Sequence, residues 1–346
     1  MSSSPGLAIV GSGAWGTTLA ILAARREPVL LLARSEPTAD RLAADRENVT
    51  RLPGIAFPER LRVGADPVDL AAAELVVFAV PSSHLRSEVE RVADRIPGTA
   101  DVVSVTKGLE AGTLMRMSEV VAEAGRIDPA RIAALSGPNL ALEIARGLPA
   151  SAVVAATDPA VAERVRQRLG RRRFRLYVNS DIIGVELCGA LKNVIAIAAG
   201  AVDELGFGDN GKAGLMTRGL AEMTRLGIAA GANPLTFAGL AGIGDVIATC
   251  GSSLSRNHRL GVELARGRTW SELEAALPGV AEGAYTVDAA IALADRLGVE
   301  MPIAREVHRA LFEGKSVKRC LVDLLARESK DELADYRRWM AGIGAG

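Results

Sequence analysis

A glycine-rich turn directly behind the first apolar segment places the strictest limit on how this chain can fold. Residues 11–16 read Gly-Ser-Gly-Ala-Trp-Gly, after the strand-like run Leu7–Val10 and before a helix that begins near Gly16. In this pattern the first glycine permits a tight turn, the second lets a pyrophosphate approach the backbone, and the third lets helix and strand pack closely. Free N–H groups at the helix start attract phosphate oxygens. The segment therefore predicts a dinucleotide-binding turn; the alternative is a tight strand-to-helix turn that holds no ligand.

Strand-like and helical segments alternate over the first half of the chain, and helical segments dominate after about residue 180. Near-continuous apolar strands that alternate with helices are typical of a parallel, doubly wound sheet covered on both faces. The expected strands are Leu7–Val10, Val29–Ala33, Leu75–Val80, Asp101–Thr106, Arg131–Leu135, Ser151–Thr157 and Phe174–Val178, with a helix over Pro159–Leu169. The sequence predicts an α/β fold: a dinucleotide-binding domain with a doubly wound (Rossmann-type) parallel sheet, residues 1–179, followed by an all-α substrate and catalytic domain, residues 180–346.

The charge balance and the cysteines exclude several classes of protein. The 346 residues carry 41 acidic and 41 basic side chains, so net charge gives no reason to expect nucleic acid or an anionic membrane as a partner. Three cysteines (Cys188, Cys250 and Cys320) form no CxxC pair, which excludes a disulfide framework and a cysteine zinc site. The N-terminus lacks the positively charged region of a signal peptide. We therefore expect a cytoplasmic protein without a metal site.

Two unusual segments have ordinary interpretations. The apolar stretch Leu187–Val202 is shorter than the roughly 20 residues of a membrane span and contains a lysine and an asparagine, so we expect a buried core helix. Seven arginines lie between Arg164 and Arg175. Because the chain as a whole is neutral, a solvated helix face and the loop after it explain them better than a nucleic-acid-binding patch.

Lys192 is the strongest single candidate for catalysis. Only Lys192 and Asn193 are strongly polar within Leu187–Val202. A helix that is apolar all round is buried, and burial lowers the pKa of a lysine toward the range useful for general acid–base chemistry. The alternative is a structural lysine paired with Glu186 or Asp245.

Further candidates follow strands of the predicted sheet, where ligands of doubly wound folds bind. Lys107 is a lone cation after the strand that ends at Thr106, suited to a phosphate or to the neighbourhood of a pyridine ring. Arg34 follows the second strand, where an acidic residue would favour NAD and an arginine accommodates the 2′-phosphate of NADP. The alternatives are a solvated turn residue for Lys107 and one more surface arginine for Arg34.

A second glycine-rich region, residues 239–259, contains two polar candidates. Gly242-Ile243-Gly244 lacks a third glycine in register and no strand precedes it, which argues against a second dinucleotide site. Asp245 either caps the following helix or holds a substrate hydroxyl. Ser255-Arg256-Asn257 combines a hydroxyl, a guanidinium fork and an amide, a set suited to binding an anion.

These motifs resemble those of the bacterial NAD(P)-dependent glycerol-3-phosphate dehydrogenases over nearly the whole chain, from Ala8 to about Glu332. The resemblance is carried by GSGAWGT, NVTRLPGIAFPERL, VVFAVPS, TKGLE, LSGPNLALEIARG, VELCGALKNVIAIAAG, GLAGIGDVIATC, SRNHRLG and VAEGAYT. The segments GALKN and LAGIGD are far more specific than the glycine turn. The sequence departs from the family in Cys188, where glycine is usual, and in Asn139, where serine is common. Residues 333–346 match no family motif.

The resemblance implies a site. Lys192 would be the catalytic acid/base. The substrate-binding residues would be Lys107, Gly137, Asn139, Asn193, Asp245, Thr249, Ser255, Arg256 and Asn257. The cofactor-binding residues would be Gly11, Ser12, Gly13, Ala14, Trp15, Gly16, Arg34, Lys107, Ala141, Arg256, Val280 and Glu282.

The resemblance also implies an activity. The expected reaction is reversible hydride transfer between NADPH or NADH and dihydroxyacetone phosphate, giving sn-glycerol 3-phosphate for phospholipid synthesis, with NADPH slightly favoured because of Arg34. A small-molecule substrate, a homodimer and no metal are expected.

Other functions fit the residues less well. No tyrosine has a lysine four positions later, as short-chain dehydrogenases require, and no zinc-ligand cluster is present. The nearest enzyme alternative is a β-hydroxyacid or ketopantoate-type dehydrogenase, which would bind a carboxylate in place of a phosphate. A non-catalytic dinucleotide sensor is the alternative from another class, but it would not need a lysine inside an apolar helix.

Overall fold

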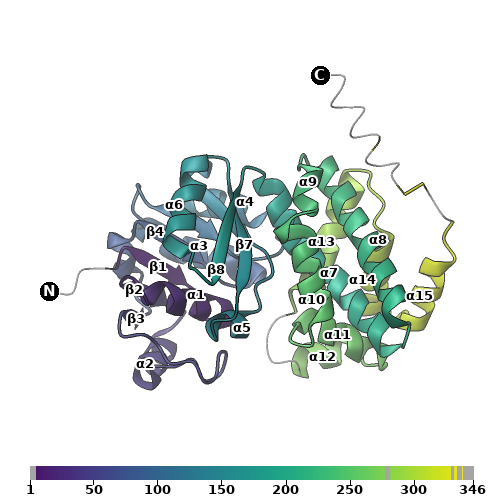
Figure 1. The fold of residues 1–346 in the computed structure, drawn as a ribbon, viewed down its shortest axis with the longest axis horizontal. Coiled ribbons are helices and arrows are strands. Elements are labelled where there is room, and N and C mark those ends of the chain that lie inside the picture. The colour runs from purple at the N-terminus through teal and green to yellow at the C-terminus, as the bar shows by residue number, and fades with distance from the viewer. Residues whose placement is uncertain (1–4, 277–280, 329–330, 333–336, 338–346) are drawn as a thin grey trace.

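The computed structural model describes residues 5–276, 281–328, 331–332 and 337. A sheet covered by helices forms one half of the molecule and a bundle of helices forms the other (Figure 1). The sheet has eight strands in the order β3-β2-β1-β4-β5-β6-β7-β8. Their bounds are β1 Leu7–Val10, β2 Val29–Leu32, β3 Leu61–Gly64, β4 Leu75–Phe78, β5 Asp101–Ser104, β6 Ile132–Ser136, β7 Ala150–Ala156 and β8 Phe174–Asn179. The α/β class and the doubly wound sheet predicted from the sequence are confirmed.

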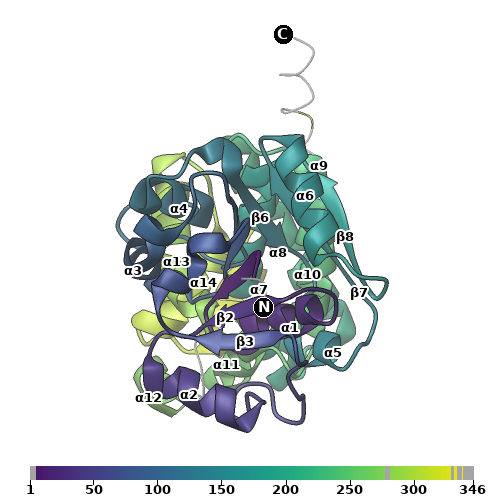
Figure 2. The same cartoon turned by 90° about the vertical axis from the view of Figure 1, so that its left-hand side faces the viewer.

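Helices cover both faces of this sheet, which explains why its central strands are apolar throughout. On one face Leu7 and Ile9 of β1 pack with α1 (Ala14–Ala24), α5 (Ala141–Ala145) and α6 (Pro159–Leu169). On the other face Ala8 and Val10 pack with helices that include α3 (Ser82–Val92) and α4 (Met117–Gly125). Alternate residues of a strand thus enter different cores. Helix α2 (Glu36–Asp45) lies next to β3 at the edge of the sheet (Figure 2).

The sequence-based description of the sheet was wrong in three details. Strand β3 was not predicted, because its sequence Leu-Arg-Val-Gly is only partly buried and contains no apolar run. Helix α1 begins at Ala14, two residues before Gly16. Strand β7 runs antiparallel to β6, so the sheet is not wholly parallel. The segment between them forms only the short helix α5 and stays at the carboxyl edge of the sheet, whereas a parallel return would require a crossover along the full strand length.

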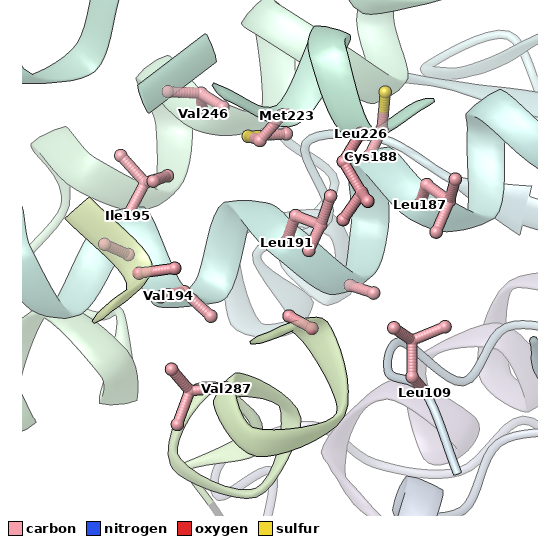
Figure 3. Packing of buried hydrophobic residues seen from close by; sticks show 14 of the residues in the cluster. Leu109, Leu187, Cys188, Leu191, Val194, Ile195, Met223, Leu226, Val246 and Val287 are labelled. Atoms are coloured by element: carbon pink, nitrogen blue, oxygen red, sulfur yellow. The ribbon is translucent and has the colours of Figure 1, made fainter. Parts of the chain in front are cut away.

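The second half of the molecule surrounds one long helix, α7 (Ile182–Glu204). Around it lie α8 (Gly208–Ala229), α9 (Pro234–Phe237), α10 (Asp245–Gly251), α11 (Arg256–Ala265), α12 (Trp270–Ala276), α13 (Glu282–Arg296), α14 (Pro302–Phe312) and α15 (Val317–Leu325). Leu187, Leu191 and Val194 of α7 belong to the buried apolar cluster that holds this bundle together (Figure 3). A methyl group at Gly261 of α11 would collide with the backbone of α7, which shows how closely the two helices approach.

The burial of α7 decides how its apolar sequence is interpreted. Two described segments, Ile182–Glu204 and Pro234–Gly251, are long and apolar enough to pass a length-and-composition test for a membrane span. The most apolar window of the first is 94% buried inside the protein. The predicted core helix is therefore confirmed; it extends beyond the predicted range at both ends.

Candidate active site

The carboxyl ends of β5 and β6 point toward α7 and α10, and the predicted catalytic lysine meets several predicted substrate-binding residues there. Lys107 follows β5 and Gly137 follows β6, whereas Lys192 lies on α7 and Asp245 begins α10. Parallel strands end at the same edge of a sheet, so residues far apart in the sequence come together. The site is built from both halves of the molecule, because Lys107 of the sheet half contacts Asp245 of the helical half.

Lys192 is buried and holds a fixed position. Its Nζ donates to Asp245 Oδ1 at 3.0 Å and to Thr249 Oγ1 at 2.6 Å. The Thr249 hydroxyl in turn donates to Asp245 Oδ1 at 3.0 Å, which closes a three-membered ring of hydrogen bonds. An ammonium group has three N–H donors, and two are used here within the described residues. One donor remains for a further acceptor.

Of the two carboxylates that the sequence offered as partners for Lys192, Asp245 pairs with it and Glu186 does not. The Glu186 carboxylate accepts from the Ser118 backbone N–H at 2.7 Å and from Arg116 Nη1 at 2.6 Å. Glu186 thereby attaches α4 to the first turns of α7.

Lys107 joins the sheet to the same aspartate. Its Nζ donates to Asp245 Oδ2 at 2.5 Å and to the carbonyl oxygen of Gly137 at 3.0 Å. Gly137 has φ of +141°, and a methyl group there would lie 2.9 Å from Ala152 Cα, so a glycine is required at this turn. Asp245 therefore bridges two ammonium groups from different halves of the molecule.

The charged groups in this cluster shift one another's pKa values. Burial lowers the pKa of Lys192 to about 8; the Asp245 carboxylate opposes this shift and the Lys107 ammonium adds to it. Burial by itself would raise the pKa of Asp245, but the two lysines outweigh that effect and hold the pKa below its usual value. A buried lysine with a pKa near neutrality can both donate and accept a proton.

The remaining substrate candidates lie beside this cluster. Asn193 Oδ1 accepts from Asn257 Nδ2 at 2.9 Å, and Asn257 Oδ1 accepts from the Gly283 N–H at 2.9 Å. Ser255 caps the N-terminus of α11, where its hydroxyl accepts from the His258 N–H at 3.2 Å. Arg256, the first residue of α11, is exposed and makes no hydrogen bond or ion pair with any residue that the structure describes.

The turn after β6 contains polar atoms that no described residue satisfies. Both amide atoms of Asn139 and the hydroxyl of Ser136 are buried without a hydrogen-bond partner. A buried polar group without a partner is destabilising, so such atoms indicate a place for a ligand or an ordered water. Ser136 is not among the residues to which the sequence assigned a substrate role. It lies next to α7, where a methyl group at Gly189 would be 2.7 Å from its Oγ.

The glycine turn has the geometry that a pyrophosphate requires. Gly11 has φ of +112°, and a methyl group there would lie 2.5 Å from the Ala79 carbonyl oxygen. A methyl group at Gly16 would collide with the carbonyl of Gly11, whereas one at Gly13 would meet nothing within 4 Å. Asn48 holds the turn by donating from Nδ2 to the Ser12 carbonyl at 2.9 Å. The turn is closed on its protein side and open at Gly13, as a dinucleotide site should be.

A matched pair of alanine variants tests this division of roles. Gly13→Ala should leave the melting temperature nearly unchanged, because its methyl group meets no protein atom, but should raise KM for NADPH at least about tenfold by filling the place of the pyrophosphate. Gly16→Ala should lower the melting temperature, because its methyl group collides with the Gly11 carbonyl. Thermal unfolding and steady-state kinetics measure both. A Gly13→Ala protein with unchanged KM for NADPH and NADH would contradict the assignment.

The other cofactor candidates occupy different environments. Trp15 is partly buried and packs edge-on against Phe174 of the core, with ring centroids 5.9 Å apart, and its Nε1 has no described partner. Arg34 is largely exposed and lies 3.7 Å from the Glu88 carboxylate. The Ala141 carbonyl accepts from the Thr18 hydroxyl of α1 at 3.2 Å.

Glu282 of the helical half is contacted by a residue of the sheet half. Its Oε2 accepts from the Ser82 hydroxyl at 2.6 Å. Ser82 lies at the start of α3, just beyond β4, and is not among the residues to which the sequence assigned a substrate or cofactor role. Val280 lies outside the described residues. Within the described ranges, no group of three or more His, Cys, Asp or Glu side chains could hold a metal ion.

Comparison with known proteins indicates one family. Residues 6–162 match the family model described as the N-terminus of NAD-dependent glycerol-3-phosphate dehydrogenase, and residues 181–322 match the model for its C-terminus. The glycerol-3-phosphate dehydrogenase [NAD(P)+] of Frankia casuarinae is 48% identical over 94% of this chain and 97% of its own. That of Streptomyces avermitilis is 46% identical over 96% and 99%.

A solved structure leads to the same family. The glycerol-3-phosphate dehydrogenase of Coxiella burnetii has a TM-score of 0.89 and 38% identity, over 94% of this chain and 99% of that one. With both family models, two full-length relatives and this fold in agreement, the chain belongs to the family of NAD-dependent glycerol-3-phosphate dehydrogenases.

Proposed function

We propose that this protein catalyses the reversible reduction of dihydroxyacetone phosphate to sn-glycerol 3-phosphate with NADPH or NADH, and that the product supplies phospholipid synthesis. The observation that carries the proposal is the buried Lys192, held by Asp245 and Thr249 with one N–H donor left over. Family membership supplies the substrate, since the relatives compared above are named for glycerol 3-phosphate. The cofactor is an NAD(P) dinucleotide, and the shape of the Gly11–Gly16 turn fits it.

The proposed chemistry balances as one hydride and one proton. Residues 11–16 would hold the cofactor, which would supply the hydride to C2 of the substrate. As the carbonyl π bond breaks, its oxygen takes a proton from Lys192 Nζ, so the products are the secondary alcohol and the oxidised cofactor. Asp245 and Thr249 orient the ammonium group, and in the reverse direction neutral Lys192 accepts the proton of the alcohol. Holding donor and carbonyl in register contributes much of the rate.

Lys107 and the start of α11 complete the proposed substrate site. Lys107 uses two of its N–H donors on Gly137 and Asp245, which leaves a third for a substrate oxygen. Ser255, Arg256 and Asn257 present their donors at the N-terminus of α11, where helix N–H groups also attract an anion. We place the substrate phosphate there, and the Asn139 amide and Asn193 near the glycerol carbons.

A direct assay tests the function. Oxidation of NADPH and of NADH, followed by absorbance, should depend on dihydroxyacetone phosphate. Ketopantoate and other phosphate-free carboxylate substrates serve as controls for the nearest alternative. Turnover of a carboxylate substrate but not of dihydroxyacetone phosphate would overturn the proposal.

The pH dependence of the two directions should differ in sign. Reduction needs protonated Lys192, whose pKa burial lowers to about 8, so kcat for reduction should fall as the pH rises through about 8. Oxidation needs the neutral amine, so kcat for oxidation should rise over the same interval. Initial rates from pH 6 to pH 10 at saturating substrates measure both. Limbs of the same sign in the two directions would exclude Lys192 as the titrating group.

Cofactor preference should depend on Arg34. Its exposed guanidinium forms only a long ion pair with the Glu88 carboxylate, at 3.7 Å, which leaves donors of its planar fork for a 2′-phosphate. Arg34→Asp should lower kcat/KM for NADPH at least about tenfold and change kcat/KM for NADH far less. An equal change in kcat/KM for both cofactors would show that Arg34 does not contact the 2′-phosphate.

We also propose the division into domains at residues 1–179 and 180–346, a homodimer and a cytoplasmic location. The end of β8 at Asn179 and the start of α7 at Ile182 support the boundary. The family resemblance supports the dimer, and the lack of a disulfide or CxxC pattern among the cysteines supports the location. Light scattering measures the oligomeric state.

A further inference from the structure

A pocket of about 360 Å³ opens between α5, the starts of β7 and β8, and α10. Its lining includes Pro138 and Ala248, and the arginines of its wall are Arg172, Arg173 and Arg175. Pockets near the small end of the usual range of 300–1,000 Å³ hold small metabolites. Neither lysine of the active site lines this pocket.

The seven arginines between residues 164 and 175 divide into two groups. Four have their donors committed within the protein: Arg164 to Asp101, Arg166 to Glu163, Arg168 to Glu27 and Glu74, and Arg171 to backbone carbonyls. The other three form no ion pair within the described residues, and all three line the pocket. All three are exposed, as predicted for a solvated helix face and the loop after it, and they differ from the first group in having no ion pair within the described residues.

Two of these three guanidinium groups are held in place by contacts that leave their charge uncompensated. Arg173 Nη1 donates to the Gly147 carbonyl at 3.0 Å. The guanidinium of Arg175 lies over the Tyr177 ring, 5.5 Å from its centroid. Arginines that are already positioned lose less side-chain freedom when they bind an anion, and their planar forks match the oxygens of a phosphate.

The rest of the wall narrows the choice of ligand. Ser151 adds a hydroxyl, and the pocket contains one carboxylate, Glu143 of α5. The lining thus has an excess of positive charge together with one acceptor for a hydroxyl or amine proton. A phosphate monoester that carries such a donor satisfies both features.

Two residues that line the pocket are chain neighbours of residues at the substrate site. Pro138 stands between Gly137, whose carbonyl accepts from Lys107, and Asn139 with its unpartnered amide. Ala248 precedes Thr249, which binds Lys192. A ligand in the pocket would contact both segments.

We propose that this arginine pocket is a second anion-binding site, specific for a small phosphate monoester and separate from the substrate phosphate site at Arg256. Inorganic phosphate is the probe, because it carries the shared chemistry of any such ligand. Binding of radiolabelled phosphate to the full chain is measured by equilibrium dialysis.

Wild-type protein should bind phosphate at the arginine pocket and at the Arg256 site. The double variant Arg172→Ala/Arg175→Ala should bind phosphate at the arginine pocket at least about tenfold more weakly. Phosphate should still inhibit its reduction of dihydroxyacetone phosphate competitively. Arg256→Ala should keep phosphate binding at the arginine pocket and lose this competitive inhibition. The control is Arg41→Ala/Arg166→Ala, which removes the same charge from exposed positions outside the pocket. All variants are checked by thermal unfolding.

The outcomes separate this proposal from the proposed function. If the Arg172→Ala/Arg175→Ala protein binds phosphate with the same stoichiometry and affinity as wild type, or if the control loses as much binding, the pocket is not a phosphate site. If the Arg172→Ala/Arg175→Ala protein loses phosphate binding but Arg256→Ala leaves both phosphate binding and inhibition unchanged, the assignment of Arg256 to the substrate phosphate fails and the arginine pocket stands.

Discussion

Replacing Lys192 with methionine is expected to lower kcat by at least about a hundredfold, the low end for loss of a general acid/base, and to leave cofactor affinity nearly intact. Methionine fits the apolar surroundings of α7 but has no proton to give. The substitution removes one buried ammonium group. The Asp245 carboxylate is not left unpaired, because it keeps its ion pair with Lys107. Steady-state kinetics in both directions and dinucleotide titration by fluorescence measure the effect.

Lys318→Met is the matched control, because Lys318 is an exposed lysine of α15, outside the candidate site. It should retain wild-type kcat. A Lys192→Met enzyme with more than a tenth of wild-type kcat would refute the assignment of Lys192 as the proton donor.

Arg256→Ala should reduce kcat/KM for dihydroxyacetone phosphate by roughly ten- to several hundredfold. A charge-assisted pair with a phosphate contributes about 1.5–3 kcal/mol, and more in a closed site. The position of Arg256 supports this role. A positive charge in the first turn of α11 is unfavourable for the helix dipole, so the residue does not stabilise its own helix.

Two comparisons distinguish phosphate binding from a general loss of function. Unphosphorylated dihydroxyacetone should be a poor substrate for wild type, and Arg256→Ala should make it little worse. Arg256→Lys should restore activity only in part, since an ammonium lacks the planar fork. If the alanine variant impairs both substrates by the same factor, Arg256 does not bind the phosphate.

The sequence was sufficient for those features that depend on local pattern. Buried strands such as Leu75–Phe78 are apolar on both faces, so their composition reveals them. Lys192 was recognisable because an apolar helix isolates it. The half-exposed strand β3 and the antiparallel direction of β7 lacked such a signal, because a strand's direction depends on the path of the chain between strands and not on its own residues.

Contacts between distant segments could not be predicted. The sequence offered Glu186 and Asp245 equally as partners of Lys192, and only the fold places Glu186 against α4. Asn48 supports the glycine turn from 36 positions away, and Ser82 meets Glu282 across 200. No local composition distinguishes these polar residues from other surface ones.

The bridge from Lys107 through Asp245 to Lys192 couples the acidity of the catalytic lysine to the closure of the molecule. Asp245 and Lys192 both belong to the helical half, whereas Lys107 belongs to the sheet. If the two halves move apart, the ion pair between Lys107 and Asp245 breaks, while the one between Lys192 and Asp245 can persist. The nearby Lys107 ammonium is one of the causes that lower the pKa of Lys192. Contact between the two halves therefore makes Lys192 a stronger acid, through burial first and the Lys107 ammonium in addition, and loss of that contact would let Lys192 hold its proton more tightly.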